Sequence, residues 1–124
     1  MEYTVKVDKS GTVHYYKLGT DVLHREGGPA VEYTNGTKRW FKEGKCHRED
    51  GPAHEFSDGG KDWFLEGKRH REDGPAMEYA DGRKEWYIEG KKLSEEEFKN
   101  RTNEAKVSTF TVPADTKEIR IQFE

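Results

Sequence analysis

The chain has 124 residues, of which 31% are hydrophobic and 38% are charged, so any core that it forms must be thin. Its 25 acidic and 22 basic residues are mixed along the chain and give a net charge of −3, which leaves no broad positive surface for nucleic acid. The one cysteine, Cys46, excludes an internal disulfide and suits a reducing compartment. Because no signal-peptide pattern and no long apolar run are present, we expect a cytoplasmic protein that does not cross a membrane.

Residues 1–23 predict a degenerate repeat at one end of the protein. Turn signals at Ser10-Gly11 and Leu18-Gly19 flank the aromatic pair Tyr15-Tyr16. The same order of turn, aromatic pair and turn returns more completely downstream. We therefore expect this segment to be a capping repeat, since the terminal unit of an array has a neighbour on one side only.

Residues 24–92 contain three copies of one 23-residue unit, which begin at His24, His47 and His70. Each copy is too small to bury its own apolar side chains, so neighbouring copies must cover one another. We expect residues 1–124 to fold as a single repeat domain.

Turn chemistry predicts one short β-hairpin in each copy. Asn-Gly or Asp-Gly pairs stand at 35–36, 58–59 and 81–82, between short segments that carry aromatic residues. The predicted strand pairs are 29–33 with 37–42, 52–56 with 61–65, and 75–79 with 84–88. A second glycine turn follows in each copy, at Gly44, Gly67 and Gly90.

The repeat pattern stops after Lys92. Ser94 and Glu97 form a capping-box pattern that predicts a short helix to about Lys99. Residues 107–112 and 118–123 then read as two strands, so residues 93–124 are expected to form a short helix and a C-terminal hairpin that caps the array. This hairpin is also a candidate for pairing with a second copy in a homodimer. The expected class is mostly all-β, an elongated antiparallel β-meander.

The repeat resembles the MORN family of β-hairpin repeats. The resemblance rests on the period of 23, the aromatic-x-x-Gly-Lys segments, the Asp-Gly turns and a tyrosine in the opposite strand, and it covers residues 30–91. The connector HREDGPA, from His47 and again from His70, departs from standard MORN units and resembles small uncharacterised proteins of tailed bacteriophages. The resemblance implies an elongated binding scaffold. Lipid binding, which is suggested for some MORN proteins, is not expected here because no cluster of positive charge is present.

The histidines that open the copies invite a metal or acid–base interpretation. Equivalent residues one hairpin apart are separated by roughly 9 to 10 Å, which is too far for a shared metal ion. We expect His24, His47 and His70 to pair with neighbouring side chains and turn amides instead. Cys46 has no CxxC partner and aligns with Arg69, which suggests an exposed and tolerant position. No catalytic motif occurs, so no catalytic residue, metal site, cofactor or enzymatic activity is expected.

Positions at which the copies differ are the candidates for recognition, because identical positions are explained by the shared fold. The differing sets are Val31/His54/Met77, Arg39/Asp62/Glu85, Lys42/Leu65/Ile88, Cys46/Arg69/Lys92 and Thr37/Gly60/Arg83. With the tryptophans as possible anchors, the candidate binding residues are Arg39, Trp40, Lys42, His54, Trp63, Leu65, Met77, Arg83, Trp86 and Ile88.

These features favour a non-enzymatic protein-binding module. The resemblance to phage proteins suggests an accessory or anti-defence factor that blocks a host protein by stoichiometric binding in the host cytoplasm. The alternative is a protein that binds or sequesters a small ligand such as a nucleotide signal, with Arg48 and Arg71 beside stacking aromatic rings. A purely structural assembly role is the third possibility.

Overall fold

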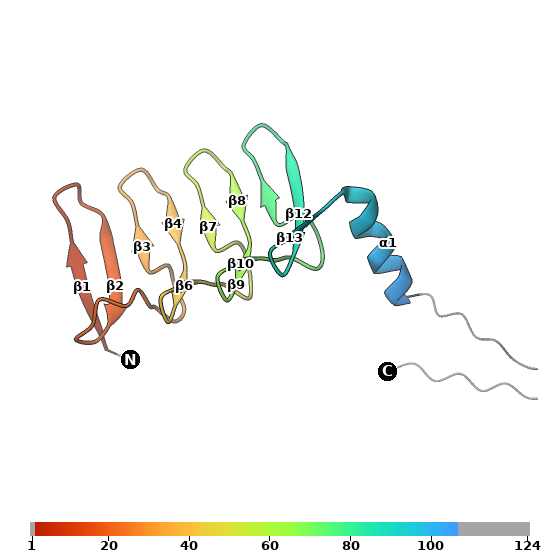
Figure 1. Ribbon diagram of the computed structural model, residues 1–124. Coiled ribbons are helices and arrows are strands. Elements are labelled where there is room, and N and C mark those ends of the chain that lie inside the picture. The colour runs from red at the N-terminus through yellow and green to blue at the C-terminus, as the bar shows by residue number, and fades with distance from the viewer. Residues whose placement is uncertain (1, 107–124) are drawn as a thin grey trace, which may run out of the picture.

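The fold is mostly β, as the sequence predicts, and its hairpins stand side by side in a row (Figure 1). A computed structural model describes residues 2–106. The main sheet has nine antiparallel strands in the order β1-β2-β3-β4-β7-β8-β11-β12-β13. These strands are β1 (Tyr3–Val7), β2 (Val13–Lys17), β3 (Val31–Glu32), β4 (Lys38–Arg39), β7 (His54–Glu55), β8 (Lys61–Asp62), β11 (Met77–Glu78), β12 (Lys84–Ile88) and β13 (Lys91–Leu93).

Each of the three full copies contains a second hairpin, so the prediction of one hairpin per copy is wrong, and in the first two copies this hairpin forms a separate small sheet. These hairpins pair β5 (Phe41–Lys42) with β6 (Lys45–Cys46), and β9 (Phe64–Leu65) with β10 (Lys68–Arg69). The predicted long strand divides at Trp40 because its backbone changes partner there. Trp40 N donates to Ala53 O of the next copy at 2.8 Å, whereas Trp40 O accepts from His47 N at 3.1 Å. In the third copy β12 stays continuous and pairs first with β11 and then with β13.

The Asn-Gly and Asp-Gly turns form at the predicted places, as three-residue loops with glycine in the last position. Gly36 has φ 94°, and Tyr33 N donates to Thr37 O at 2.9 Å. The Asn35 side chain accepts a hydrogen bond from Thr37 N at 2.9 Å, which explains why Asn or Asp stands there. The N-terminal segment builds the same loop with Gly11 at φ 91°.

The second turn of each full copy has two consecutive residues at positive φ. Glu66 has φ 49° and Gly67 has φ 80°, and the same pair recurs at Glu43-Gly44 and Glu89-Gly90. Two central residues at positive φ define a type I′ turn, the form that matches strand twist in a two-residue hairpin. Glutamate is a poor residue for this conformation because its Cβ crowds the backbone.

We therefore expect Glu66→Asn to stabilise the protein by about 0.5 to 1 kcal/mol, since Asn tolerates positive φ best after glycine. Urea denaturation measures the change. Glu72→Asn is the control, because Glu72 is exposed and has an ordinary φ. An equal gain in both variants would contradict the explanation.

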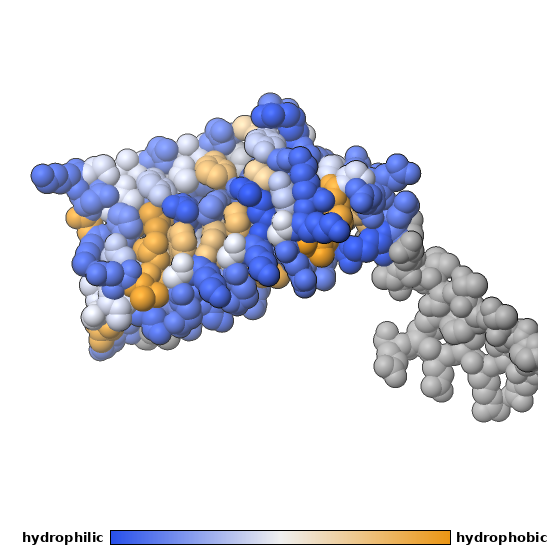
Figure 2. All heavy atoms as spheres, viewed as in Figure 1, coloured by the Kyte–Doolittle hydropathy of each residue, from blue (hydrophilic) through white to orange (hydrophobic). Residues whose placement is uncertain are grey.

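The core of the described chain is small, with few fully buried side chains. Three equivalent alanines, Ala30, Ala53 and Ala76, are completely buried, and Val31 and Phe41 join Ala30 in the largest apolar cluster. Tyr15, Leu23, Tyr33 and Cys46 pack against this cluster. Figure 2 shows the result on one face, where bands of apolar side chains alternate with hydrophilic ones.

The helix α1 (Glu95–Lys106) follows the array and is longer than predicted. The predicted capping box is present, since Glu97 N donates to Ser94 Oγ and Ser94 N donates to Glu97 Oε1, both at 3.0 Å. Phe98 is 7% exposed, and α1 contacts β12 and β13. The predicted C-terminal strands, 107–112 and 118–123, lie outside the described residues. Within the described part of the chain, no helix has the length and apolar character to cross a membrane.

Candidate functional site

The connectors between copies are held by an arginine that stacks on an aromatic ring. The Arg48 guanidinium lies 3.9 Å from the centre of the Trp40 ring and donates from Nη1 to Pro52 O and to Glu55 Oε1, both at 3.0 Å. Its Nε donates to Asp50 Oδ1 at 3.0 Å. The same stacking occurs at the neighbouring connectors, between Arg25 and Tyr15 and between Arg71 and Trp63. The arginine that is identical in all connectors therefore serves as a structural clamp.

The glycine before each proline leaves room for this clamp. A Cβ added at Gly51 would lie 3.0 Å from Arg48 Cζ, and Gly28 and Gly74 have the same relation to their own arginines. Moving the guanidinium costs its hydrogen bonds to Pro52 and Glu55 and its contact with Trp40.

We expect Gly51→Ala to destabilise the protein by about 2 kcal/mol through loss of these contacts. Gly60→Ala is the matched control. Its added Cβ would lie 3.1 Å from Asp58 Oδ1, but Thr37 and Arg83 carry a Cβ beside the same loop in the other copies, so we expect a change within about 0.5 kcal/mol. Urea denaturation compares the two variants, and equal losses would contradict the clamp.

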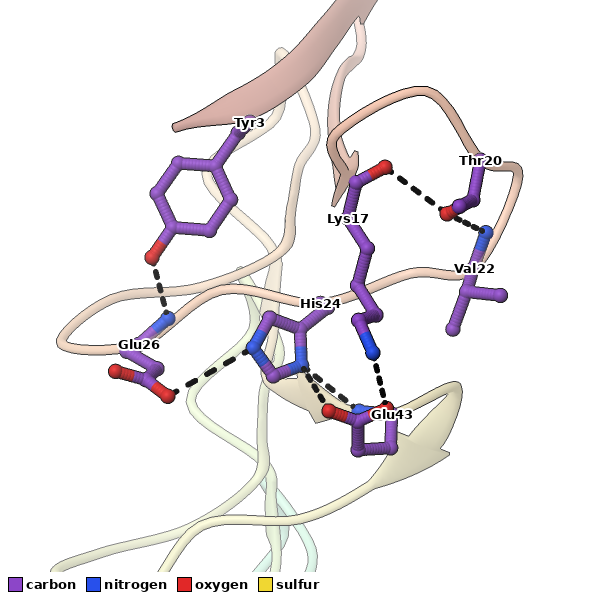
Figure 3. A network of polar contacts seen from close by, with 7 residues as sticks. All are labelled: Tyr3, Lys17, Thr20, Val22, His24, Glu26 and Glu43. Carbon is purple, nitrogen blue, oxygen red and sulfur yellow. Dashed lines mark hydrogen bonds and ion pairs between the residues drawn. The ribbon is translucent and has the colours of Figure 1, made fainter. Parts of the chain in front are cut away.

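The histidine that opens each copy caps the type I′ turn of that same copy. His24 Nδ1 accepts a hydrogen bond from Glu43 N at 2.9 Å, as His47 does from Glu66 N and His70 from Glu89 N, all 19 residues apart. Figure 3 shows the His24 imidazole between Glu43 and Glu26, whose Oε1 lies 3.9 Å from Nε2. The expected pairing with turn amides is confirmed, so this ring nitrogen is already used for structure. Among the described residues, no group of three His, Cys, Asp or Glu side chains could hold a metal ion.

Strand register separates the identical positions from the differing ones. One row of cross-strand partners reads Glu32, Lys38, Glu55, Lys61, Glu78 and Lys84, all identical between copies. The neighbouring row reads Val31, Arg39, His54, Asp62, Met77 and Glu85, all taken from the differing sets. Neighbouring residues of a strand point to opposite faces, so the two rows lie on opposite faces of the sheet. The arginines of the connectors bind Glu32, Glu55 and Glu78 of the identical row. The connectors therefore lie on one face, and the differing row lies on the other.

The differing row borders a groove of about 450 Å³, which we call the variable groove. Its lining residues are Tyr33, Asn35, Thr37, Arg39, His54, Phe56, Asp62 and Arg69. Phe56 is 41% exposed, which makes it one of the most exposed large apolar side chains of the described chain. The groove therefore combines an accessible aromatic ring with polar groups that differ from copy to copy.

Cys46, His54 and Asp62 come together beside the variable groove. Cys46 Sγ lies 3.0 Å from His54 Nε2, and Asp62 Oδ2 lies 3.7 Å from His54 Nδ1. The expectation of an exposed Cys46 is wrong, because Cys46 packs against the apolar cluster. Burial raises the pKa of its thiol to about 12.

This order of groups is that of a nucleophile, a base and a carboxylate, but the geometry opposes nucleophilic catalysis. Arg39 Nε donates to His54 Nε2 at 3.3 Å, so the nitrogen that would accept the thiol proton already faces a guanidinium donor. A thiol with a raised pKa holds its proton at neutral pH and is a poor nucleophile. The arrangement favours a polar interior network.

The structure divides the predicted binding residues among several places. Arg39 and His54 lie together in the variable groove. Trp40 and Lys42 line a groove of about 490 Å³ between two connectors, and Trp63 and Leu65 line the equivalent groove of about 520 Å³ one copy later. The other four, Met77, Arg83, Trp86 and Ile88, line none of these three grooves.

Six residues of the variable groove are missing from the candidate set predicted from the sequence: Tyr33, Asn35, Thr37, Phe56, Asp62 and Arg69. Asp62 and Arg69 already belonged to differing sets, so aligning the copies carried part of the signal. Phe56 replaces the tyrosines Tyr33 and Tyr79 of the other copies, a difference that the alignment also contains. Only the strand register shows that these residues meet.

Comparisons with protein-family models, with curated proteins and with solved structures found no match to this chain.

Proposed function

We propose that this chain is a non-enzymatic module that binds a partner protein through the variable groove. The proposal rests on a difference between the two faces of the main sheet: one is held together by identical residues, and the other presents residues that differ between copies. Residues that are identical in the copies bind one another, as in the clamp of Arg48, Pro52 and Glu55. Several residues that differ, among them Arg39, His54 and Arg69, line the variable groove, in which the ring of Phe56 is exposed. A non-repeating surface on a repeating scaffold is suited to one specific partner.

The partner we propose is a bacterial host protein that the module blocks by stoichiometric binding, as the resemblance to small phage proteins suggests. The small-ligand alternative receives less support. It relied on Arg48 and Arg71, and both guanidinium groups contact carboxylates, a backbone carbonyl and a tryptophan ring of this chain.

Site-specific photo-crosslinking tests the proposal. Phe56 is replaced by benzoylphenylalanine, and the full chain is irradiated in lysate of a bacterial host. We expect one crosslinked protein, which then binds the purified wild-type chain in a fixed ratio. The control carries the same residue at Glu96, which is exposed on α1. Equal crosslinking from both positions, or no crosslinked protein, would count against the variable groove as a protein-binding site.

A further inference from the structure

Two arginines of the variable groove form no ion pair with a carboxylate among the described residues, although the charge of Arg69 is, after Lys92, one of the smaller causes that lower the pKa of Glu85. Arg39 donates to His54 Nε2 and to Tyr33 Oη, both at 3.3 Å, and neither group is an anion. Arg69 lies 5.2 Å from the centre of the Phe64 ring, and its buried Nε has no hydrogen-bond partner. By contrast, a carboxylate lies within 3.3 Å of each of the arginines Arg25, Arg48, Arg71 and Arg83.

In the next copy, the residue equivalent to Arg69 forms an ion pair with a carboxylate. Lys92 is the equivalent of Arg69, and Lys92 Nζ lies 2.6 Å from Glu85 Oε1. The residue equivalent to Glu85 is Asp62, whose side chain is one methylene shorter and lies against His54 Nδ1 at 3.7 Å. Asp62 therefore does not reach Arg69. In the preceding copy the acidic position is occupied by Arg39 itself, which adds a second positive charge.

We propose that the variable groove binds a carboxylate side chain of an acidic partner segment between Arg39 and Arg69, a specificity that rests on the function proposed above. Hydrogen bonds between a guanidinium and a carboxylate are about twice as strong as neutral ones, and two arginines that form no ion pair within the described chain can supply them. The volume of about 450 Å³ accommodates such a side chain, and the rings of Tyr33 and Phe56 line the groove beside its methylene groups.

The test uses two capped peptides, hexaglutamate and hexaglutamine, and inorganic phosphate. The readout is the ¹H–¹⁵N signal of the Nε–H groups of Arg39 and Arg69 in the full chain, followed during titration at low salt. We expect hexaglutamate to shift both signals, and hexaglutamine to shift neither. The dissociation constant for hexaglutamate is expected to rise at least ten-fold in an Arg39→Gln/Arg69→Gln variant and to stay within two-fold in Arg83→Gln. Arg83 is the matched control because its side chain is 71% exposed and it binds Asp81.

Equal affinity of the double variant, equal shifts with hexaglutamine, or shifts with phosphate alone would overturn the carboxylate site. Retained folding of the double variant is checked by its circular dichroism and its urea midpoint; if it unfolds, the single variant Arg69→Lys replaces it, with the expected ten-fold loss. The peptide titration does not depend on the host protein. Crosslinking at Phe56 without any response of Arg39 and Arg69 to hexaglutamate would reject this inference and leave the proposed function standing.

Discussion

Replacing Trp63 by alanine is expected to lower the free energy of unfolding by about 3 kcal/mol, the lower end of the range for removing a large aromatic side chain. Trp63 is half-buried, and the Arg71 guanidinium stacks 3.9 Å from its ring centre. Loss of the ring removes this contact and leaves the Arg71 guanidinium without the aromatic surface on which it stacks. Urea denaturation followed by circular dichroism measures the change.

Phe56→Ala is the control for this prediction. Phe56 is 41% exposed, so we expect its removal to cost less than about 1 kcal/mol. Trp63→Phe should lie between the two, because a smaller ring still supports Arg71. A loss at Phe56 equal to that at Trp63 would show that the ring under the clamp has no special role.

This contrast changes how binding should be tested. The sequence predicts Trp63 as a binding anchor, but its ring stacks against Arg71, an arginine that is identical between the copies, so a binding defect in Trp63→Ala would reflect altered folding. Phe56 and Arg69 lie on the other face and belong to the positions that differ between copies. Substitutions there report on recognition with less disturbance of the scaffold.

The sequence predicted what short-range chemistry determines. The loop at Gly36, the turn at Gly67 and the capping box of Ser94 and Glu97 all form where expected. Each depends on the φ preference of one residue or on hydrogen bonds that span a few residues, and such preferences are readable in one copy. Repetition then extends each prediction along the array.

The sequence did not predict the features that depend on contacts between copies. The strand divides at Trp40 because its N–H binds Ala53 of the next copy, and no local signal marks that change. The interior position of Cys46 depends on which way β6 faces, and a shift of one residue in register would reverse it. The variable groove has the same origin, because Arg39, His54 and Arg69 come from strands of three different hairpins.

Iodoacetamide is expected to alkylate Cys46 about 1,000-fold more slowly in the folded protein than in the chain unfolded in urea, both at pH 8. Only the thiolate reacts, and burial raises the pKa of the Cys46 thiol from 9.0 to about 12, a change of three units. Mass spectrometry of quenched samples measures both rates. Rates within ten-fold of each other would show that the thiol is accessible and ionised, and would reopen the question of a nucleophile beside His54.

The same shift predicts how stability depends on pH. The unfolded thiol loses its proton near pH 9, whereas the folded thiol keeps its proton to about pH 12, so between these values the unfolded chain binds fewer protons. The contribution of Cys46 to stability is therefore complete below pH 9 and is lost as the pH rises towards 12. We expect the free energy of unfolding to fall more steeply between pH 9 and 10.5 in the wild type than in Cys46→Ala, where the other titrating groups are the same. Parallel slopes would mean that the protonated thiol contributes nothing to the network of His54 and Asp62.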